Sequence, residues 1–320
     1  MATTDNYIKV EEITNATTIS RDDKILFDTG AGGDNGTKII KYSDFMKCFV
    51  PDTAAAHNAI FRGKDLTNVY TKDQIYAKIN AGTFEDLFIG DYFDVSITTQ
   101  VPTSYDSENN TWTYTSVTET VRHILAGFDT FMQNGDSALT RHHAVIVPKN
   151  TFTTNHPMNH SHTTVGAYKE SVMRTDILLA YQTALETAHG NHLLNRRVLV
   201  SNAMDSTFYS MAGANFKGAS KGWEWMDSKL DLLSEVQVYG STVLSSSFYD
   251  VGTDNLQLPL FRLDPSAKVC GKGGTGSGRN WWWLKAVAST TDFCYVSSGG
   301  RSGYDGAGVS RGVRPLFVIG

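Results

Sequence analysis

RNWWWLK at residues 279–285 and GVRPLFVI at residues 312–319 are the two apolar stretches that frame the last forty residues of the chain. Between them, bulky apolar residues such as Phe293 and Val296 alternate with small or polar ones. Apolar residues at this spacing are sufficient to place one or two short strands against a core. The other side chains of the region are therefore expected to face out of the fold.

The small and polar side chains of this region predict a binding surface within residues 281–320. A rigid frame that presents such residues suits recognition, because tyrosine supplies contact area at low entropic cost and serine and glycine supply adaptable hydrogen bonds. The predicted ligand-contacting residues are Ser289, Thr290, Thr291, Asp292, Tyr295, Ser297, Ser298, Arg301, Tyr304, Asp305 and Ser310.

Three consecutive tryptophans are expected to divide between core and surface. Side chains alternate along a strand, so Trp282 points to the opposite side from Trp281 and Trp283. We expect two of the three to be core, whereas an exposed tryptophan there offers a platform for a sugar or a protein. Arg314, before Pro315, is predicted to hold the terminal strand by pairing with an acid or with carbonyls.

The order of these residues resembles the C-terminal domain of phage virion proteins that have a C-type-lectin-like fold. Some of those proteins are the variable targets of diversity-generating retroelements. The positions that carry the likeness are Trp282, Trp283, Leu284, Lys285, Phe293, Val296, Gly300, Ala307, Gly312, Val313, Arg314 and Pro315. Lys285 stands where arginine is usual, Trp281 is additional, and the likeness extends over roughly residues 55–320. The structural frame that it implies is Trp282, Trp283, Phe293, Val296, Gly312, Arg314 and Pro315.

By this resemblance, the chain is expected to be a structural protein of a bacteriophage virion, of the tail-fibre or receptor-binding type. Its face at 281–320 is expected to bind a protein or glycan of the host cell surface, without a reaction and without a cofactor. A homotrimer assembled in the host cytoplasm and carried on the particle is also expected. Two alternatives stay open: a purely structural capsid or tail decoration protein, and an enzyme that cleaves glycans.

The composition permits a large core and disfavours several classes of partner. Hydrophobic residues make up 41% of the 320 residues and charged residues only 19%, which excludes a disordered or coiled-coil chain. The net charge is −5 and no run of lysine and arginine occurs, so we expect no nucleic-acid binding. No apolar run approaches the roughly 20 residues of a membrane span. Cys48, Cys270 and Cys294 are too few for a disulfide framework and are interpreted as small buried residues.

The first fifty residues are predicted to form a separate β-rich module, and residues 51–320 the lectin-like domain. A strand through residue 28, a glycine-rich turn at 30–36 and a return strand at 37–42 predict a hairpin, with Ser43 capping a short helix. The module resembles N-terminal modules of phage tail fibres, which implies that it attaches the chain to other virion proteins or helps it to trimerise.

Short strands and few helices predict an α+β fold for the remainder. Thr71 and Gln74 form a capping-box pattern before a helix at 71–79. Further helices are predicted at 175–187 and 228–235, and a polar loop at 99–110. The predicted strands are 87–89, 92–97, 112–117, 123–128, 144–147 and 198–200.

Two sets of residues raise the question of metal binding or catalysis. His156, His160 and His162 have the spacing of metal ligands, but no HExxH motif or cysteine-rich partner accompanies them. We therefore predict no metal site and interpret the three histidines as polar loop residues. If the chain did bind a metal, these three would be the candidate ligands. Asp86, Asp91 and Asp94 have the residue type of a glycosidase pair, and carboxylates are equally common in tight turns.

Overall fold

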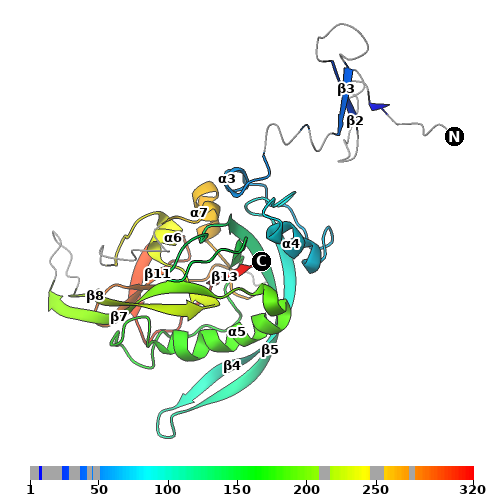
Figure 1. The fold of residues 1–320 in the computed structure, drawn as a ribbon. Helices are drawn as coiled ribbons and strands as arrows, with labels where there is room; N and C mark the ends of the chain where they lie inside the picture. Colours follow the sequence, from blue (N-terminus) through cyan, green and yellow to red (C-terminus); the bar gives the residue numbers. More distant parts are fainter. Residues whose placement is uncertain are drawn as a thin grey trace.

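The computed structural model describes residues 7–8, 24–28, 37–41, 45, 51–208, 217–245, 256–273 and 278–320. Its helices and antiparallel strands form an α+β fold (Figure 1), as the sequence predicts. The buried hydrophobic residues from Leu66 to Ile319 belong to one continuous cluster.

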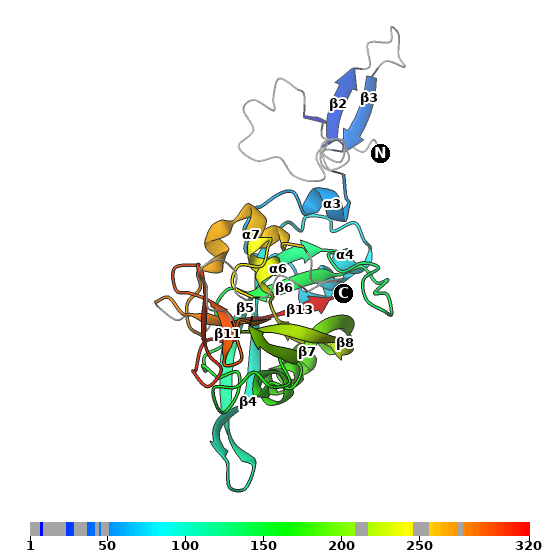
Figure 2. The ribbon, with the colours of Figure 1, turned by 90° about the vertical axis from the view of Figure 1, so that its left-hand side faces the viewer.

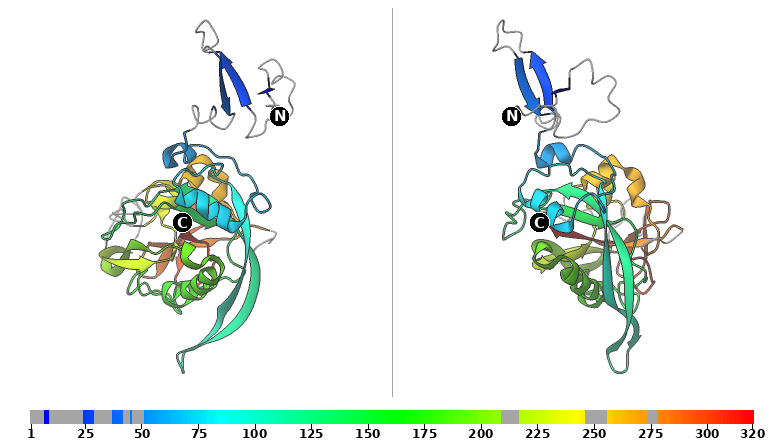
Figure 3. Two further views of the ribbon diagram at one scale, coloured as in Figure 1. Left: turned by 45° about the vertical axis from the view of Figure 1, so that its right-hand side comes forward. Right: turned by 90° about the vertical axis from the view of Figure 1, so that its right-hand side faces the viewer.

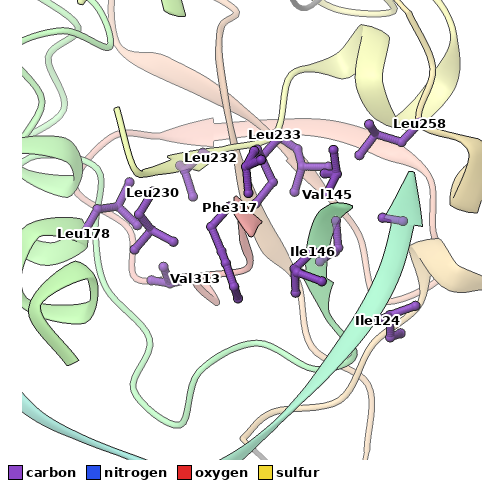
Figure 4. Close-up of a cluster of buried hydrophobic side chains, with 14 of the residues drawn as sticks. Ile124, Val145, Ile146, Leu178, Leu230, Leu232, Leu233, Leu258, Val313 and Phe317 are labelled. Carbon is purple, nitrogen blue, oxygen red and sulfur yellow. The ribbon is translucent and has the colours of Figure 1, made fainter. Parts of the chain in front are cut away.

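A five-stranded antiparallel sheet organises the body of the molecule. Its strand order is β4 (Tyr92–Asp106), β5 (Thr111–Phe128), β6 (Ala144–Pro148), β13 (Pro315–Ile319) and β9 (Leu230–Leu232). Every residue of β13 is buried, because the strand lies between β6 and β9. Figure 4 shows Phe317 of β13 among Leu230, Leu232 and Ile146 in the core.

The remaining strands of the body form two smaller antiparallel units. The first is a three-stranded sheet of β10 (Trp282–Val287), β11 (Asp292–Val296) and β12 (Ser302–Gly306). The second is a ribbon of β7 (Arg196–Phe208) and β8 (Lys217–Ser228), which contains the predicted strand 198–200.

The β4–β5 hairpin is longer than the sequence predicts and projects beyond the rest of the body (Figures 2 and 3). The prediction of a polar loop at 99–110 was wrong, because β4 runs on to Asp106 and β5 is continuous through the two strands predicted at 112–117 and 123–128. Threonine is a strand-forming residue, and here its hydroxyls also pair across the ladder, as in the 2.9 Å hydrogen bond between Thr98 and Thr118.

The helices begin and end at local signals. In α4 (Lys72–Asn80) Thr71 is the N-cap and Gln74 completes the capping box, which confirms that prediction. The helix predicted at 175–187 is a π-helical turn, η1 (Met173–Ile177), followed by α5 (Leu178–His189) and the 3₁₀ turn η2 (Gly190–His192). The remaining helical segments are α3 (Ala54–His57), α6 (Glu235–Tyr239), α7 (Pro259–Leu263) and η3 (Pro265–Lys268).

Two other local predictions were wrong. The helix expected at 228–235 is replaced by β9, because Asp231 pairs with Leu316 in the sheet and the helix α6 starts only at Glu235. The strand expected at 87–89 is a single bridge between Phe61 and Ile89. Asp86 and Gly90, which flank the predicted strand, have left-handed backbone conformations (φ 56° and 85°), and these prevent a longer strand there.

Within the first fifty residues, β1 (Tyr7–Ile8), β2 (Lys24–Asp28) and β3 (Thr37–Lys41) form a sheet of their own. The antiparallel pairing of β2 with β3 confirms the predicted hairpin. The glycine-rich turn, the capping residue Ser43 and Cys48 lie outside the described residues. Cys270 and Cys294 are buried, as predicted, and they are not joined in a disulfide bond.

Candidate recognition site

The predicted frame residues form the buried support of the C-terminal region. Trp282, Trp283, Phe293 and Val296 are completely buried, and Gly312 and Pro315 are buried as well. Trp281 is the only partly exposed member of the tryptophan run. The indole nitrogens of the two buried tryptophans donate to the carbonyls of Lys268 and His156, at 3.0 and 2.9 Å. Each large ring is therefore both packed and fixed in orientation.

Arg314 holds the terminal strand through backbone carbonyls. Its side chain is 1% exposed, and it donates to the carbonyls of Pro148 and Ala267, both at 2.7 Å. The guanidinium also lies 5.0 Å from the centroid of the Trp282 ring. Burial lowers the pKa of Arg314, and the carbonyl oxygens and the ring face offset the loss of water.

The predicted contact residues are all at least partly exposed, but the structure does not gather them on one surface. Residues 289–291 lie in the turn between β10 and β11, and Asp292 begins β11, whereas Ser297, Ser298 and Arg301 lie at the β11–β12 turn. The two turns are separated by the length of β11, roughly 15 Å for five residues. Ser310 lies on the exposed segment after β12.

Alternation along the strands also separates the tyrosines. Asp305 and Tyr304 are paired with Phe293 and Cys294, so their side chains point to opposite faces of the small sheet. Tyr295 lies on the same face as Asp305, and Tyr304, which is 52% exposed, is on the other. The residues that were predicted to share one surface therefore lie on two opposite faces of the small sheet and in two separate turns.

The β10–β11 turn uses most of its polar groups internally. The Ser289 hydroxyl oxygen accepts from the backbone N–H groups of Thr291 and Asp292, both at 3.1 Å. Thr164 then binds the turn from outside, donating from its hydroxyl to the Ser289 carbonyl at 2.8 Å. These hydrogen bonds give the residues of this turn a structural role.

The structure does bring together Tyr295, Asp305, Trp281 and Arg311, which we call the recognition cluster. The rings of Trp281 and Tyr295 stack at 5.0 Å between centroids. The guanidinium of Arg311 lies 4.5 Å from the Trp281 ring and 5.7 Å from the Tyr295 ring, and it forms an ion pair with Asp305. The cluster thus offers two aromatic faces beside one cation and one anion.

The recognition cluster is partly desolvated, although ligands can reach it. The side chains of Arg311 and Asp305 are 27% and 28% exposed. Burial, and secondarily the charge of Asp305, raises the pKa of the Tyr295 hydroxyl, which therefore stays a hydrogen-bond donor at neutral pH. Half-buried aromatic and arginine side chains of this kind are typical of the energetic centres of binding interfaces.

Sequence reasoning missed two of the four members. The sequence predicts that one of the three tryptophans is exposed, but alternation does not single out Trp281, because it groups this residue with Trp283, which is completely buried. Arg311 had no signal, because it reaches the cluster through a bridge of its backbone to His156, 155 positions away along the chain. Gly303, opposite Tyr295, was also missed: a Cβ atom there would lie 2.5 Å from the tyrosine ring.

The three histidines with ligand-like spacing are not gathered around one point. His156 is buried beside Tyr181, His160 stacks on Tyr105 at 3.6 Å, and His162 lies exposed against Gly306. Within the ranges given above, no group of three or more His, Cys, Asp or Glu side chains is arranged to hold a metal ion.

The three aspartates considered as glycosidase residues are each bound by an arginine. Arg62 donates to Asp86 and to Asp91, at 2.5 and 2.6 Å. Arg122 donates to both oxygens of Asp94, at 2.9 and 3.0 Å. These ion pairs give the aspartates a structural role: they fix the segment that precedes β4 and the β4–β5 hairpin.

Comparison with known proteins gives a family but no activity. Residues 142–320, more than half of the chain, match the sequence model of a family described as a domain of unknown function (DUF6273). No curated protein and no solved structure matches the chain. None of the helices in the described part of the chain is long and apolar enough to cross a membrane.

Proposed function

The chain belongs to the DUF6273 family, and on that premise we propose that it is a recognition protein of a bacteriophage virion that binds a protein or glycan of the host cell surface. The observation that carries this proposal is the recognition cluster, a half-exposed set of aromatic and charged side chains on a completely buried frame. Such a surface can stack on an apolar face and hydrogen-bond at its rim without reorganising.

The topology supports the finer proposal of a lectin-like fold. The two ends of the family region lie side by side, since Ile319 of β13 faces Ala144 of β6 in the sheet register. A domain whose ends meet in one sheet leaves the intervening segments free to form a binding face, which is what the resemblance to phage C-type-lectin-like domains implies. Loops on a rigid scaffold are where binding residues concentrate.

Display of several copies on one particle strengthens attachment through binding sites that are individually weak. We propose that the N-terminal module attaches the chain to other virion proteins and that the chain acts as a homotrimer carried on the virion. Linked copies bind a surface with much higher avidity than a single site, by roughly 10²–10⁴-fold. A modest intrinsic affinity of the recognition cluster is therefore sufficient for attachment.

Binding of the purified chain to intact candidate host cells tests the proposal. We expect Trp281→Ala and Arg311→Ala each to lower the affinity at least about tenfold, because each removes a central aromatic or guanidinium contact. Tyr304→Ala is the matched control, since it removes an exposed ring from the opposite face of the same sheet. If all three variants bind like the wild type, the cluster is not the receptor site, and packing against other virion subunits becomes the leading account.

Gly303→Ala provides a subtler test of the same site. The new methyl group would displace the ring and hydroxyl of Tyr295 while removing no side chain of the cluster. We expect weaker binding with a nearly unchanged melting temperature, because the ring is the free end of a partly exposed side chain. Unchanged binding would show that the ligand does not contact Tyr295.

A further inference from the structure

Four buried side chains near Tyr181, itself among them, carry polar atoms that form no hydrogen bond of ordinary geometry with the part of the chain that the structure describes. They are the Glu119 Oε1, the Thr99 Oγ1, the His156 Nε2 and the Tyr181 hydroxyl; the Thr154 side chain approaches the Tyr181 hydroxyl, but without the geometry of an ordinary hydrogen bond. Their residues are only 8%, 1%, 3% and 0% exposed. Since native proteins pair the great majority of buried polar atoms, such a concentration requires an explanation.

These atoms come from separate elements that pack on one another. Thr99 of β4 and Glu119 of β5 lie on the same face of the hairpin, because Glu119 is paired with Ile97 and side chains alternate. Tyr181 belongs to α5, which packs against β4; burial, and secondarily the charge of the neighbouring Glu119, raises the pKa of its hydroxyl. The His156 ring meets the Tyr181 ring edge-on, at 6.4 Å between centroids.

The four groups are complementary to one kind of ligand. Glu119 uses its other oxygen to accept from the N–H and the hydroxyl of Thr153, at 3.1 and 2.9 Å, which leaves Oε1 as an acceptor. Nε2 of His156 is a second acceptor in the tautomer that carries its proton on Nδ1. The hydroxyls of Thr99 and Tyr181 are donors. A water molecule supplies two protons and two lone pairs, which matches two acceptors and two donors.

We propose that Thr99, Glu119, His156 and Tyr181 form an internal hydration site, in which one or two ordered water molecules bridge the β4–β5 hairpin, α5 and the segment of His156. Phe152 stacks on Tyr181 at 3.9 Å and closes the site with an apolar wall. Burial lowers the pKa of His156 to about 4, so its ring is neutral near pH 7 and Nε2 can accept a hydrogen bond from water.

His156 connects the proposed hydration site to the recognition cluster. The backbone of His156 exchanges hydrogen bonds with Arg311 in both directions, at 2.9 and 3.0 Å, and its carbonyl also accepts from Trp283. Bound water therefore holds the residue that fixes the position of Arg311. This link makes the hydration site a support of the cluster, whatever ligand the cluster binds.

The sign of the stability change in Thr99→Val tests the proposal. If the hydroxyl binds water, valine leaves the water and its partners short of one donor, and we expect the melting temperature to fall by about 2–4 °C. If the hydroxyl has no partner, valine removes a buried unsatisfied group and the melting temperature rises, which overturns the proposal. Tyr76→Phe is the reference variant: it shows how far the melting temperature falls when a buried hydroxyl loses a direct partner, because the Tyr76 hydroxyl binds His189 at 2.7 Å.

A second variant and a crystal structure locate the water. Tyr181→Phe is expected to lower the melting temperature, and the double variant with Thr99→Val to lower it by less than the sum, because both hydroxyls donate to the same solvent. A high-resolution crystal structure is expected to show water density within hydrogen-bond distance of Thr99 and Glu119. Strictly additive losses, direct pairing of the four side chains, or a metal ion identified by anomalous scattering would each overturn the proposal.

Discussion

Replacing Asp231 by alanine is expected to destabilise the protein by about 3–5 kcal/mol, a large share of the stability of an ordinary domain. Asp231 is 2% exposed and is the anion of a buried network. It accepts hydrogen bonds from Lys285 at 3.1 Å and from Tyr168 at 2.6 Å, and Arg196 approaches it at 3.5 Å. Without the carboxylate, the buried Lys285 and Arg196 lose the negative charge that Asp231 supplies.

The network joins parts of the fold that are separate in sequence. Asp231 belongs to β9 in the five-stranded sheet, Lys285 to β10 in the three-stranded sheet and Arg196 to the start of β7. Tyr168 donates to Asp231 and accepts from the N–H of Leu232 at 3.1 Å. Burial and the neighbouring Asp231 raise the pKa of Tyr168 well above its ordinary value, which keeps the hydroxyl a donor. Loss of the anion therefore weakens contacts among three groups of strands.

Chemical unfolding monitored by tryptophan fluorescence measures the loss. Asp136→Ala is the control, because Asp136 also binds an arginine bidentately, Arg197 at 2.6 and 2.8 Å, but on the surface. We expect the control to change stability little. Asp231→Asn keeps the shape of the side chain and should cost nearly as much as the alanine variant, since the missing charge is the cause. Equal, small effects of Asp231→Ala and Asp136→Ala would contradict a stabilising role for the buried anion.

Local signals explain which parts of the fold could be predicted from the sequence. The capping box at Thr71 and Gln74 acts within one helical turn, so the pattern and the structure agree. The strands at 144–147 and 315–319 are uninterrupted apolar runs that are buried on both faces in the sheet. Both kinds of signal depend only on residues that are close together in the sequence.

The predictions that failed depend on contacts between distant segments. Residues 228–235 have no strand pattern of their own, and only the pairing of Asp231 with Leu316 makes β9. Likewise the recognition cluster requires Arg311 to reach Trp281 across thirty residues, which no spacing in the sequence indicates. Composition alone predicts that 281–320 presents polar side chains, but the strand register decides which of them face the same way.

Acidification is expected to destabilise the protein steeply, because buried histidines are held neutral. His189 accepts from the Tyr76 hydroxyl at 2.7 Å, and its other ring nitrogen lies 3.0 Å from a nitrogen of His123. One proton bridges the two rings when both are neutral, and a second proton would place two donors face to face. Burial lowers the pKa of His189 to about 4, and it lowers the pKa of His123 well below its ordinary value, helped by the charge of His189.

The direction of the pH effect follows from these shifts. An unfolded histidine titrates near pH 6.5, whereas folded His189 and His156 titrate at about 4, so the unfolded chain binds more protons between these values. The stabilisation is complete above about pH 6.5 and is lost as the pH falls towards 4. At pH 5 each of these two groups is expected to cost about 2 kcal/mol.

Unfolding free energies measured between about pH 7 and pH 5 test the mechanism, with His189→Gln as the diagnostic variant. Glutamine can still accept from Tyr76 and donate to His123, but it does not titrate. We therefore expect the variant to be less stable at neutral pH and to show a weaker dependence on pH, by up to one proton. His162→Gln is the control, because that side chain is exposed on the surface. A wild-type stability that is flat over this window would show that the buried histidines are charged in the fold or exposed to water, contrary to their hydrogen bonding.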